Sequence, residues 1–437
     1  MKTEEIVKKQ TKYIVPGSVK GRYPVAIVEA KGAVIKDVEG KEYIDCHGGY
    51  AAVNVGHCHP RVVKALQEQA AKVWHVSWDF YLLPTTQLAE RLAEICPGGL
   101  RRVFFASSGA EAVENAVKFA KKYVYTRQGR GGSQVISLMG SFHGRTAYAM
   151  ALTGQEKYKV GLSTYVHPGV VHVPPPYCYR CFFKLTYPDC DLYCAKYLEQ
   201  VFKFKTAGGD VAAFISEPIM GEGGIIVPPE GYLKEAVEIV REHEALYIAD
   251  EIQTGFGRTG KLFGVEWYGA EPEIMTLAKG IASGVPLAAV TVTEEIAEVL
   301  TPIDHCSTYG GNALACAAAV ANIDVLLEER LTEKALRMGE KIMRGLEDLA
   351  EKYPLVGEVR GKGLMIGVEL VKDRESKKPA AEEAERIRLE AMKRGLLINT
   401  GGVFGCVLRF QPPLLITEEQ VERALEILDD SFRVVTP

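Results

Sequence analysis

The chain has 437 residues, of which 47% are hydrophobic and 25% are charged, and its formal net charge at pH 7 is −4. This apolar content is enough for a large buried core, and the balanced charge disfavours a generic nucleic-acid-binding or polybasic membrane surface. The first ten residues do not resemble a secretory signal, and no apolar run is long enough to span a membrane. We therefore expect a cytoplasmic protein that binds neither nucleic acid nor membranes.

The N-terminal part of the chain alternates between apolar and polar residues from Val25 to Ile44. The alternation is interrupted by a turn-like sequence at residues 37–40, which contains Asp37 and Gly40. This pattern predicts a small antiparallel meander.

From about residue 100, short continuous apolar runs appear, and several of them alternate with helical patterns. Continuous apolar strands that alternate with helices are typical of a mostly parallel sheet covered by helices on both faces, in an α/β fold. The predicted strands of this sheet are residues 103–106, 135–139, 211–215, 245–249 and 274–278.

A long charged helix is predicted over residues 317–352, ending just before Pro354. Shorter strand and helix patterns follow it and indicate a smaller α+β domain. We expect an N-terminal segment (1–55) that packs with this small domain, a large domain (56–325) and a C-terminal small domain (326–437).

Polar residues follow the predicted strands, where ligands bind in open parallel sheets. Ser108 and Glu111 have capping-box spacing, so the N–H groups of Gly109 and Ala110 either begin an ordinary helix or hold a phosphate. Asp250 ends one strand, and Lys279 follows the next as either a buried ion-pair partner or a desolvated, nucleophilic amine. A lysine, an aspartate and a phosphate cradle are the groups that pyridoxal phosphate requires.

Residues 255–260 match the pattern G-x-G-x-x-G after a predicted strand, which raises the possibility of a dinucleotide site. Two carboxylates, Asp250 and Glu251, stand where a pyrophosphate would lie, and no helical pattern follows. A nicotinamide-dependent oxidoreductase is therefore a remote alternative.

With these residues assembled, the chain resembles the class III aminotransferases, a fold type I group of pyridoxal-phosphate enzymes that includes the 4-aminobutyrate, acetylornithine and alanine–glyoxylate aminotransferases. The resemblance covers nearly the whole chain and implies a large domain with a mostly parallel sheet and a smaller α+β domain. The motifs that carry it are NVGHCHP (54–60), FFASSGAEAVENAVKFA (104–120), SFHGRTAYAMALTG (141–154), SEPIMGEGGIIVPPEGYL (216–233), YIADEIQTGFGRTG (247–260), TLAKGIASGVPLAA (276–289), STYGGNALACAAA (307–319), VRGKGLMIGVEL (359–370) and LRFQPPL (408–414).

The resemblance implies roles for individual residues around the cofactor. Lys279 would form the Schiff base and move the proton, Asp250 would pair with the pyridinium nitrogen, and Gln253 would contact the 3-hydroxyl group. Phe142 would stack on the ring, with His143 beside it. Ser108, Gly109 and Ala110 would hold the phosphate within the same chain. Thr308 would hold the phosphate of the neighbouring subunit.

On the substrate side, the resemblance makes Arg409 the residue that binds a substrate carboxylate. Glu217 matches the glutamate that pairs with this arginine when the substrate presents an amine end, and Arg145 matches a second carboxylate-binding arginine. Tyr50 would line the mouth of the pocket. The family also implies a homodimer or a dimer of dimers with shared active sites, and no catalytic metal.

The expected reaction is transfer of an amino group from an ω-amino acid, an amine or an α-amino acid to a 2-oxo acid. A racemase or epimerase on the same fold is the main alternative, because it would use the same lysine and cofactor. An inert binding protein is a further alternative that the intact set of Lys279, Asp250 and Thr308 disfavours.

Four of the ten cysteines crowd into one segment, residues 174–197, with the spacing C-x2-C-x8-C-x3-C. This segment is not a feature that we associate with the best-known family members. A structural zinc site, one or two disulfide bonds, and free thiols all fit the spacing. The four residues are Cys178, Cys181, Cys190 and Cys194.

Overall fold

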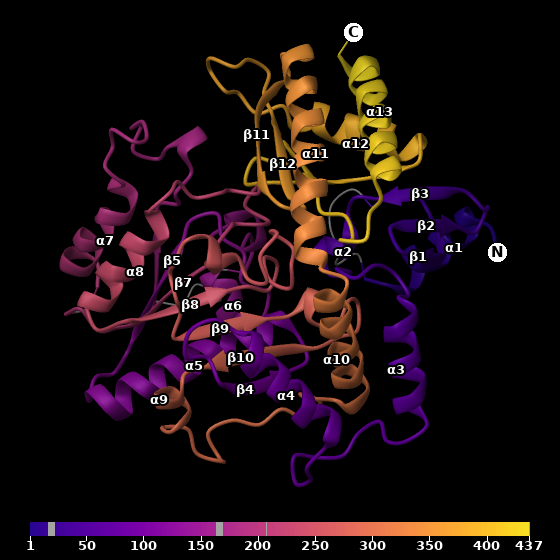
Figure 1. Ribbon diagram of the computed structural model, residues 1–437. Coiled ribbons are helices and arrows are strands. Elements are labelled where there is room, and N and C mark those ends of the chain that lie inside the picture. Colours follow the sequence, from indigo (N-terminus) through magenta and orange to yellow (C-terminus); the bar gives the residue numbers. More distant parts are fainter. Residues whose placement is uncertain (16–21, 163–168, 207, 437) are drawn as a thin grey trace.

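The computed structural model describes residues 1–15, 22–162, 169–206 and 208–436. Its centre is a seven-stranded sheet in the order β4-β10-β9-β8-β7-β5-β6 (Figure 1). The strands are β4 (Arg102–Ala106), β5 (Gln134–Leu138), β6 (Val170–Val173), β7 (Val211–Ser216), β8 (Leu246–Asp250), β9 (Ile274–Leu277) and β10 (Ala288–Val292). Only β10 pairs antiparallel with its neighbours in this sheet. The predicted α/β architecture with a mostly parallel sheet is confirmed, and β6 and β10 add to the five predicted strands.

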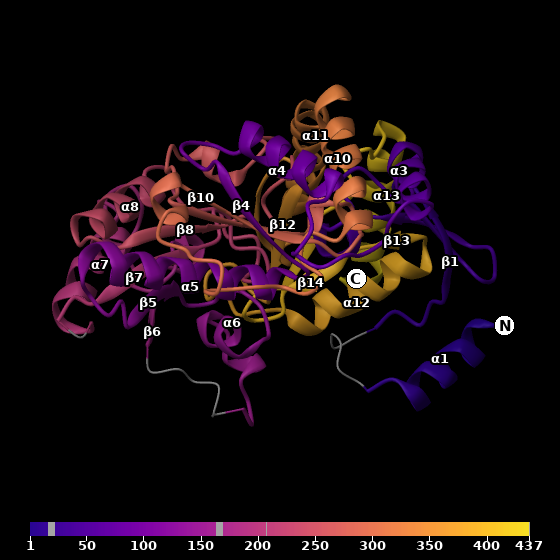
Figure 2. The ribbon, with the colours of Figure 1, turned by 90° about the horizontal axis from the view of Figure 1, so that it is seen from below.

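Both faces of this sheet are buried, which explains why its strands are apolar along their whole length. One face packs against α5 (Gly109–Gln128) and α6 (Ala147–Leu152), and the other against α4 (Leu83–Ile95) and α8 (Tyr232–Glu242) (Figure 2). Helix α7 (Tyr193–Phe204) packs on α8. Consecutive residues of β8 therefore enter different cores, as the buried side chains of Tyr247 and Ile248 do.

Two smaller sheets lie outside the large one, and one of them contains strands from both ends of the chain. The antiparallel sheet β11-β12-β15-β14 consists of β11 (Val356–Lys362), β12 (Met365–Leu370), β14 (Asn399–Gly401) and β15 (Val407–Phe410). The predicted N-terminal meander forms β1 (Ile27–Lys31), β2 (Val34–Asp37) and β3 (Glu42–Asp45), and β13 (Leu396–Leu397) pairs in parallel with β3. The N-terminal segment is thus tied to the C-terminal part, whereas the predicted domain boundaries stay a prediction.

The long helix predicted over residues 317–352 is wrong, because two helices occupy this stretch, α10 (Ala313–Glu328) and α11 (Leu331–Lys352). Arg330 between them has a left-handed backbone with φ of 52°. Helix α10 packs on α3 (Pro60–Ala70) and α4, while α11 packs on β11 and α13 (Glu418–Val435). Each helix buries its apolar side against a different partner, and one break in the helix permits both.

The remaining helices are short or lie at the surface. They are α1 (Thr3–Tyr13), α2 (Gly48–Ala51), α9 (Glu294–Ala297) and α12 (Ala381–Lys393), with short 3-10 turns at Glu156–Tyr158, Cys178–Arg180, Gly264–Trp267 and Lys279–Ile281. Within the described ranges, no helix combines the length and apolar character that a membrane crossing requires.

Candidate active site

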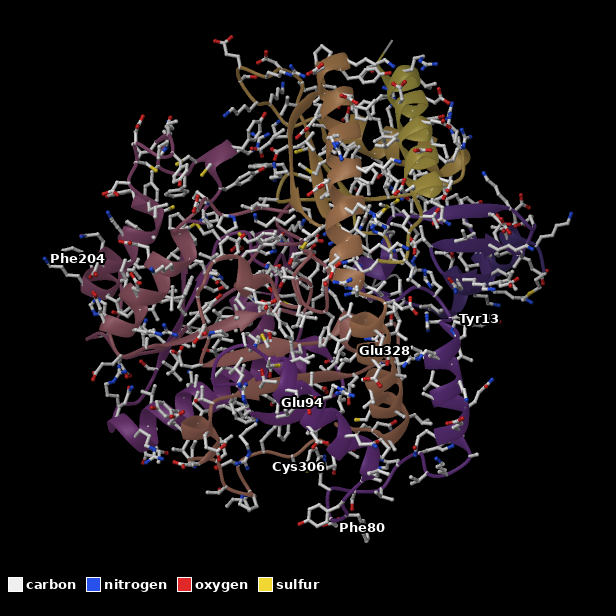
Figure 3. All side chains as sticks on the ribbon, viewed as in Figure 1. Tyr13, Phe80, Glu94, Phe204, Cys306 and Glu328 are labelled. Carbon is white, nitrogen blue, oxygen red and sulfur yellow. The ribbon has the colours of Figure 1, made fainter. Side chains whose placement is uncertain are left out.

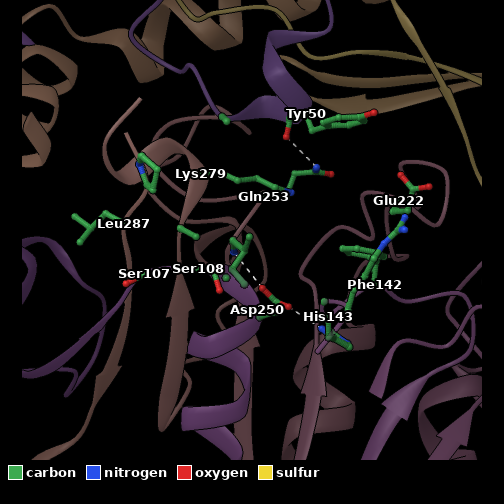
Figure 4. Close-up of a pocket in the computed structure, with 18 of the residues that line it drawn as sticks. Tyr50, Ser107, Ser108, Phe142, His143, Glu222, Asp250, Gln253, Lys279 and Leu287 are labelled. Carbon is green, nitrogen blue, oxygen red and sulfur yellow. Dashed lines mark hydrogen bonds and ion pairs between the residues drawn. The ribbon is translucent and has the colours of Figure 1, made fainter. Parts of the chain in front are cut away.

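A cavity of about 510 Å³ opens at the carboxyl ends of the parallel strands, where ligands bind in folds of this type. Figure 4 shows Asp250 and His143 at its foot, Tyr50 above them, and Glu222 on the opposite side from Leu287. Among the described residues, Lys279 is the only lysine in the lining. The structure therefore brings together most of the site residues predicted from the sequence.

The N-terminus of α5 forms one wall of the cavity. Ser108 caps the helix by accepting a hydrogen bond from the Glu111 N–H at 3.4 Å, and the Glu111 carboxylate accepts from the N–H groups of Ser107 and Ser108. The N–H groups of Gly109 and Ala110 have no acceptor inside the helix, because they lie in its first turn. Together with the helix dipole they form an anion site, as the predicted phosphate cradle requires.

Asp250 lies at the end of β8 and is held from three directions. One carboxylate oxygen lies 2.7 Å from Nδ1 of His143, and the other accepts from the Ile252 N–H and the Thr276 hydroxyl, both at 3.1 Å. Asp250 and His143 are each only 2% exposed. A carboxylate with this many partners has one orientation, so it offers a fixed negative charge to the cavity.

Lys279 follows β9, and its backbone is left-handed with φ of 47°, a conformation that a non-glycine residue rarely adopts. Burial lowers the pKa of its amine to about 8, although the nearby carboxylates of Glu217 and Asp250 act in the opposite direction. A lysine with this pKa supplies a useful fraction of neutral, nucleophilic amine near neutral pH.

Glu217 is buried at the end of β7 and accepts hydrogen bonds from the N–H groups of Phe142 (3.0 Å) and Gly221 (2.7 Å). Burial, reinforced by the charge of Asp250, raises the pKa of this carboxyl group to about 7. Glu217 thus ties two loops together beneath the cavity and does not pair with Arg409.

The carboxylate that pairs with Arg409 is Glu222, at 2.8 Å, and the sequence-based choice of Glu217 for this position is therefore corrected. Glu222 also accepts from the Tyr158 hydroxyl at 2.6 Å. Burial would raise the pKa of Glu222, but Arg409 and Tyr158 more than offset this and hold it below its usual value. Glu222 lines the cavity, whereas the 1% exposed Arg409 lies behind it on β15.

The other predicted substrate residues lie near this pair. Tyr50 has a left-handed backbone with φ of 62°, and its carbonyl group accepts from the Gln253 side chain at 3.2 Å. Arg145 is exposed at the cavity, with its guanidinium 4.3 Å from the ring centre of Tyr158 and 5.9 Å from that of Phe142. Arg145 and Arg409 therefore flank the Tyr158 and Glu222 corner of the pocket, and the ammonium group of Lys157 lies 3.6 Å from the Glu222 carboxylate.

Thr308 is the predicted cofactor residue that the structure does not bring to this cavity. It is exposed, and it lines a separate hollow with Glu111, Lys118 and His305. This location agrees with the expectation that Thr308 serves a neighbouring subunit, which stays a prediction.

Two residues of the substrate side were missed by sequence reasoning, Glu222 and Tyr158. The motif SEPIMGEGG contains two glutamates five positions apart, and position along the chain does not tell which of them reaches Arg409. Tyr158 lies in a short 3-10 turn after the motif SFHGRTAYAMALTG, with no pattern that marks it as functional.

In the structure, Cys178, Cys181, Cys190 and Cys194 are free thiols that line one small cavity of about 20 Å³. Burial, followed by the neighbouring Cys178 and Cys190, raises the pKa of the Cys194 thiol to about 12. In the described part of the chain, no group of three or more Cys, His, Asp or Glu side chains is arranged to hold a metal ion.

These features fit pyridoxal phosphate. The first turn of α5 suits a phosphate, Asp250 suits a protonated ring nitrogen, and the aromatic ring of Phe142 lines the same cavity. Among the described residues, the buried Nε2 of His143 and Oε1 of Gln253 have no hydrogen-bond partner, although both side chains line the cavity. Buried polar atoms of this kind normally have partners, which a polar ring in the cavity would supply.

Comparison with known proteins agrees with this chemistry. The sequence profile of the family "Aminotransferase class-III" matches residues 17–432. The acetylornithine aminotransferase of Methanocaldococcus jannaschii is 41% identical over 94% of each chain, and the leucine/methionine racemase of Thermococcus litoralis is 39% identical over 98% of this chain and 95% of that protein. An (S)-enantioselective ω-transaminase from Thermomicrobium roseum has a TM-score of 0.92 and 35% identity, with coverage of 100% of this chain and 99% of that one. The chain belongs to the class III aminotransferases, a family of pyridoxal-phosphate-dependent enzymes.

Proposed function

We propose that the protein transfers an amino group from an ω-amino acid, an amine or an α-amino acid to a 2-oxo acid, with Lys279 as the catalytic base and Arg409 as the carboxylate-binding residue. The observation that carries this proposal is the ion pair between Glu222 and Arg409 at the cavity wall. In this pair, the carboxylate of Glu222 covers the arginine that would bind a substrate carboxylate. The same pocket therefore suits both substrates that carry a carboxylate and substrates that carry an amine at that position.

Bound pyridoxal phosphate supplies an electron sink that makes the Cα–H bond of an amino donor acidic. Lys279, whose pKa is lowered to about 8, is the group that takes up and returns this proton. Asp250 would stabilise a positive charge at the ring nitrogen of the bound cofactor, and its own carboxylate is held by His143, Thr276 and a backbone N–H. Phe142 would hold the ring, and the first turn of α5 would hold the phosphate.

The pair of Glu222 and Arg409 explains how two kinds of substrate share the site. With the pair closed, Glu222 and the Tyr158 hydroxyl face the cavity and suit an amine or another uncharged or cationic end. When a 2-oxo acid or an α-amino acid enters, its carboxylate replaces Glu222 as the partner of Arg409, in a two-pronged contact that guanidinium groups favour. The exposed Arg145 is the proposed partner of a second carboxylate.

Racemisation or epimerisation is the second candidate, because a leucine/methionine racemase is 39% identical over 98% of this chain. That reaction would use the same base and cofactor, but the proton would return to the opposite face of Cα and no amino group would leave the donor.

A half-reaction separates the two candidates. The cofactor-loaded protein is mixed with single donors and no oxo acid, and the spectrum, the products and the optical rotation are followed. Transamination predicts loss of the yellow lysine-linked form and one oxo product for each active site. A protein that stays yellow while one enantiomer becomes a mixture is a racemase, and that result contradicts the proposed transfer.

We further propose a homodimer in which Thr308 completes the phosphate site of the partner subunit. Thr308 is exposed outside its own cavity, the exposed Tyr309 follows it, and the exposed Trp78 and Phe80 line a neighbouring pocket together with Gly310. Trp78 donates to the Ser307 carbonyl at 2.8 Å, and Phe80 and Cys306 lie at the same end of the molecule (Figure 3). Exposed apolar patches of this kind mark interfaces.

The dimer is tested by light scattering together with the variant Thr308→Ala. The expected result is a dimeric mass and weaker cofactor binding in the variant, without loss of the dimer. A monomeric mass for an active protein contradicts the proposed shared site.

A further inference from the structure

The substrate-facing Glu222 lies on a closed loop, here named the Glu222 turn (residues 220–226). Its two ends are joined by a bridge in which Met220 and Ile226 exchange backbone hydrogen bonds at 3.0 and 3.1 Å. Inside the turn, the buried Ile225 has a left-handed backbone with φ of 52°. A β-branched residue in this conformation is strained and persists only when its surroundings hold it.

Arg360 on β11 supplies this restraint. Its guanidinium donates to the Ile225 carbonyl at 2.9 Å and to the Gly224 carbonyl at 2.6 Å. A planar guanidinium with five donors can hold two adjacent carbonyl groups in a way that a lysine ammonium cannot. The backbone two residues beyond Glu222 is thus fixed by a side chain that does not line the cavity.

Arg360 is in turn held by Glu369 on β12, at 2.8 Å, and Glu369 is fully buried. Arg360 also pairs with Glu358 on its own strand, β11. Two residues of the cysteine-containing segment join this group, because the Tyr177 hydroxyl and the Arg180 guanidinium both donate to the Glu369 carboxylate. Tyr177 also accepts from Arg360 at 3.1 Å. Burial would raise the pKa of Glu369, but Arg360, Tyr177 and Arg180 lower it, so the carboxylate stays charged.

The opposite charges in this group hold its side chains in one arrangement. A buried carboxylate with two arginines and a tyrosine is costly to break, because removing one partner leaves an uncompensated charge. The two guanidinium groups come from different parts of the chain, Arg360 from the small C-terminal sheet and Arg180 from the segment between β6 and α7. The contact therefore joins the cysteine-containing segment to the small sheet beside the Glu222 turn.

We propose that Arg360 is a positioning residue for substrate selection. Held by Glu369 and Tyr177, with Arg180 bound to the same Glu369 carboxylate, it fixes the Glu222 turn and thereby determines how readily a substrate carboxylate replaces Glu222 as the partner of Arg409. The cysteine-containing segment then acts on donor choice through Tyr177 and Arg180. This inference rests on the proposed function, because it assigns the balance between amine donors and carboxylate substrates to a group outside the cavity.

The test compares three variants of the holoenzyme. Arg360→Lys keeps the positive charge beside Glu369 but loses the planar guanidinium group that donates to two carbonyl groups. Tyr177→Phe keeps the aromatic ring but loses the hydroxyl group. Arg130→Lys is the matched control, because Arg130 also donates to two backbone carbonyls, those of Gly209 (3.3 Å) and Glu244 (2.8 Å), on a surface loop away from the cavity. Each is assayed with an amine donor without a carboxylate, and with L-alanine.

The expected result for Arg360→Lys is a change of about tenfold in the ratio of kcat/KM between the two donors, mainly through KM, with cofactor absorbance unchanged. Tyr177→Phe is expected to shift the ratio in the same direction by a smaller factor, and Arg130→Lys to leave it unchanged. An unchanged ratio in a folded Arg360→Lys variant overturns the inference. If that variant does not fold, an unchanged ratio in Tyr177→Phe overturns it.

Hydrogen exchange separates this inference from the proposed function. Faster amide exchange in residues 221–226 of Arg360→Lys, but not of Arg130→Lys, is expected whether or not the wild-type protein transaminates. A wild-type protein without transamination contradicts the proposed function alone, and unaltered exchange in these residues contradicts the positioning role.

Discussion

The two ends of the active site are built in different ways. At the cofactor end, Asp250 ends one strand of the mostly parallel sheet and Lys279 follows the neighbouring strand. The helix that begins at Gly109 follows another strand of the same sheet. At the substrate end, Tyr50, Glu222 and Arg409 come from segments that lie far apart along the chain. The cofactor end has one arrangement set by the sheet, whereas the substrate end depends on an ion pair that a ligand can replace.

This difference predicts how each end responds to substitution. Changes at the cofactor end remove groups that no other residue replaces, so the activity should fall by the same factor for every substrate. Changes at the substrate end redistribute charge between Glu222, Arg409 and the ligand, so substrates are affected unequally. The following variants test this contrast, from the largest expected effect to the smallest.

Replacing Lys279 by alanine removes the only lysine that lines the cavity among the described residues. Transamination is expected to fall by about 10⁴-fold or more for every donor, because the base and the cofactor link are both lost. Single-turnover kinetics measure the loss. Lys159→Ala is the control, since Lys159 is also buried but lies outside the cavity, and a comparable loss there would contradict a specific role for Lys279.

Asp250→Asn keeps the size of the side chain but removes the charge that faces the ring nitrogen. We expect kcat to fall by about 10²-fold to 10³-fold for all donors, together with weaker cofactor binding. Thr276→Val removes one of the hydrogen bonds to Asp250 and serves as the milder comparison. A loss confined to one class of donor would show that the cofactor end also selects substrates.

Glu222→Gln removes the carboxylate that covers Arg409. For donors without a carboxylate we expect KM to rise by about tenfold, because the arginine is left with an uncompensated charge in the pocket. For α-amino acids the KM is expected to stay the same or to fall. Steady-state kinetics with both donor classes measure the effect, and an equal change for both would contradict the replaceable ion pair.

Glu217 contributes a pH dependence to folding stability. Its pKa is raised to about 7 in the folded state, so the native state favours the protonated form, and stability is lost as pH rises from about 4.5 through 7. The loss is on the order of 3 kcal/mol. Urea unfolding at several pH values should show that the free energy of unfolding of Glu217→Gln falls less steeply with rising pH than that of the wild-type protein.

Glu251 provides the control for this pH effect, because burial also raises its pKa to about 7 while it lies outside the cavity. Glu251→Gln should flatten the stability profile in the same way but leave the pH profile of kcat unchanged. Glu217→Gln, by contrast, is expected to change the pH profile of kcat, because Glu217 lines the cavity. Equal effects of the two variants on this profile would contradict that role of Glu217.

Ser108→Ala tests the smallest effect, at the boundary between helix capping and phosphate binding. Loss of the cap is expected to lower the free energy of unfolding by about 1 kcal/mol. Cofactor affinity, followed by fluorescence titration, should fall only a few-fold, because the N–H groups of Gly109 and Ala110 remain. A total loss of cofactor binding would contradict this expectation, because it would mean that the Ser108 hydroxyl group, and not the N–H groups of the helix, provides most of the affinity for the phosphate.

Much of the fold and of the cofactor end could be predicted from the sequence, because both depend on patterns that are local in the chain. Continuous apolar runs predicted five of the seven strands of the large sheet, and each run was followed by its functional residues. The break at Arg330 was not predicted, because the helical pattern continues through residues 317–352 and only packing against two different partners interrupts it.

The sequence by itself determined the family, the parallel sheet and the positions of Lys279 and Asp250, since strand period and residue type are local properties. Only the tertiary structure decided that Glu222, and not Glu217, reaches Arg409. Both glutamates lie in one short motif, in which Ile225 has a left-handed backbone and its carbonyl group accepts a hydrogen bond from Arg360. These contacts, and the pairing of Glu222 with Arg409, join residues more than 130 positions apart, which no local pattern encodes.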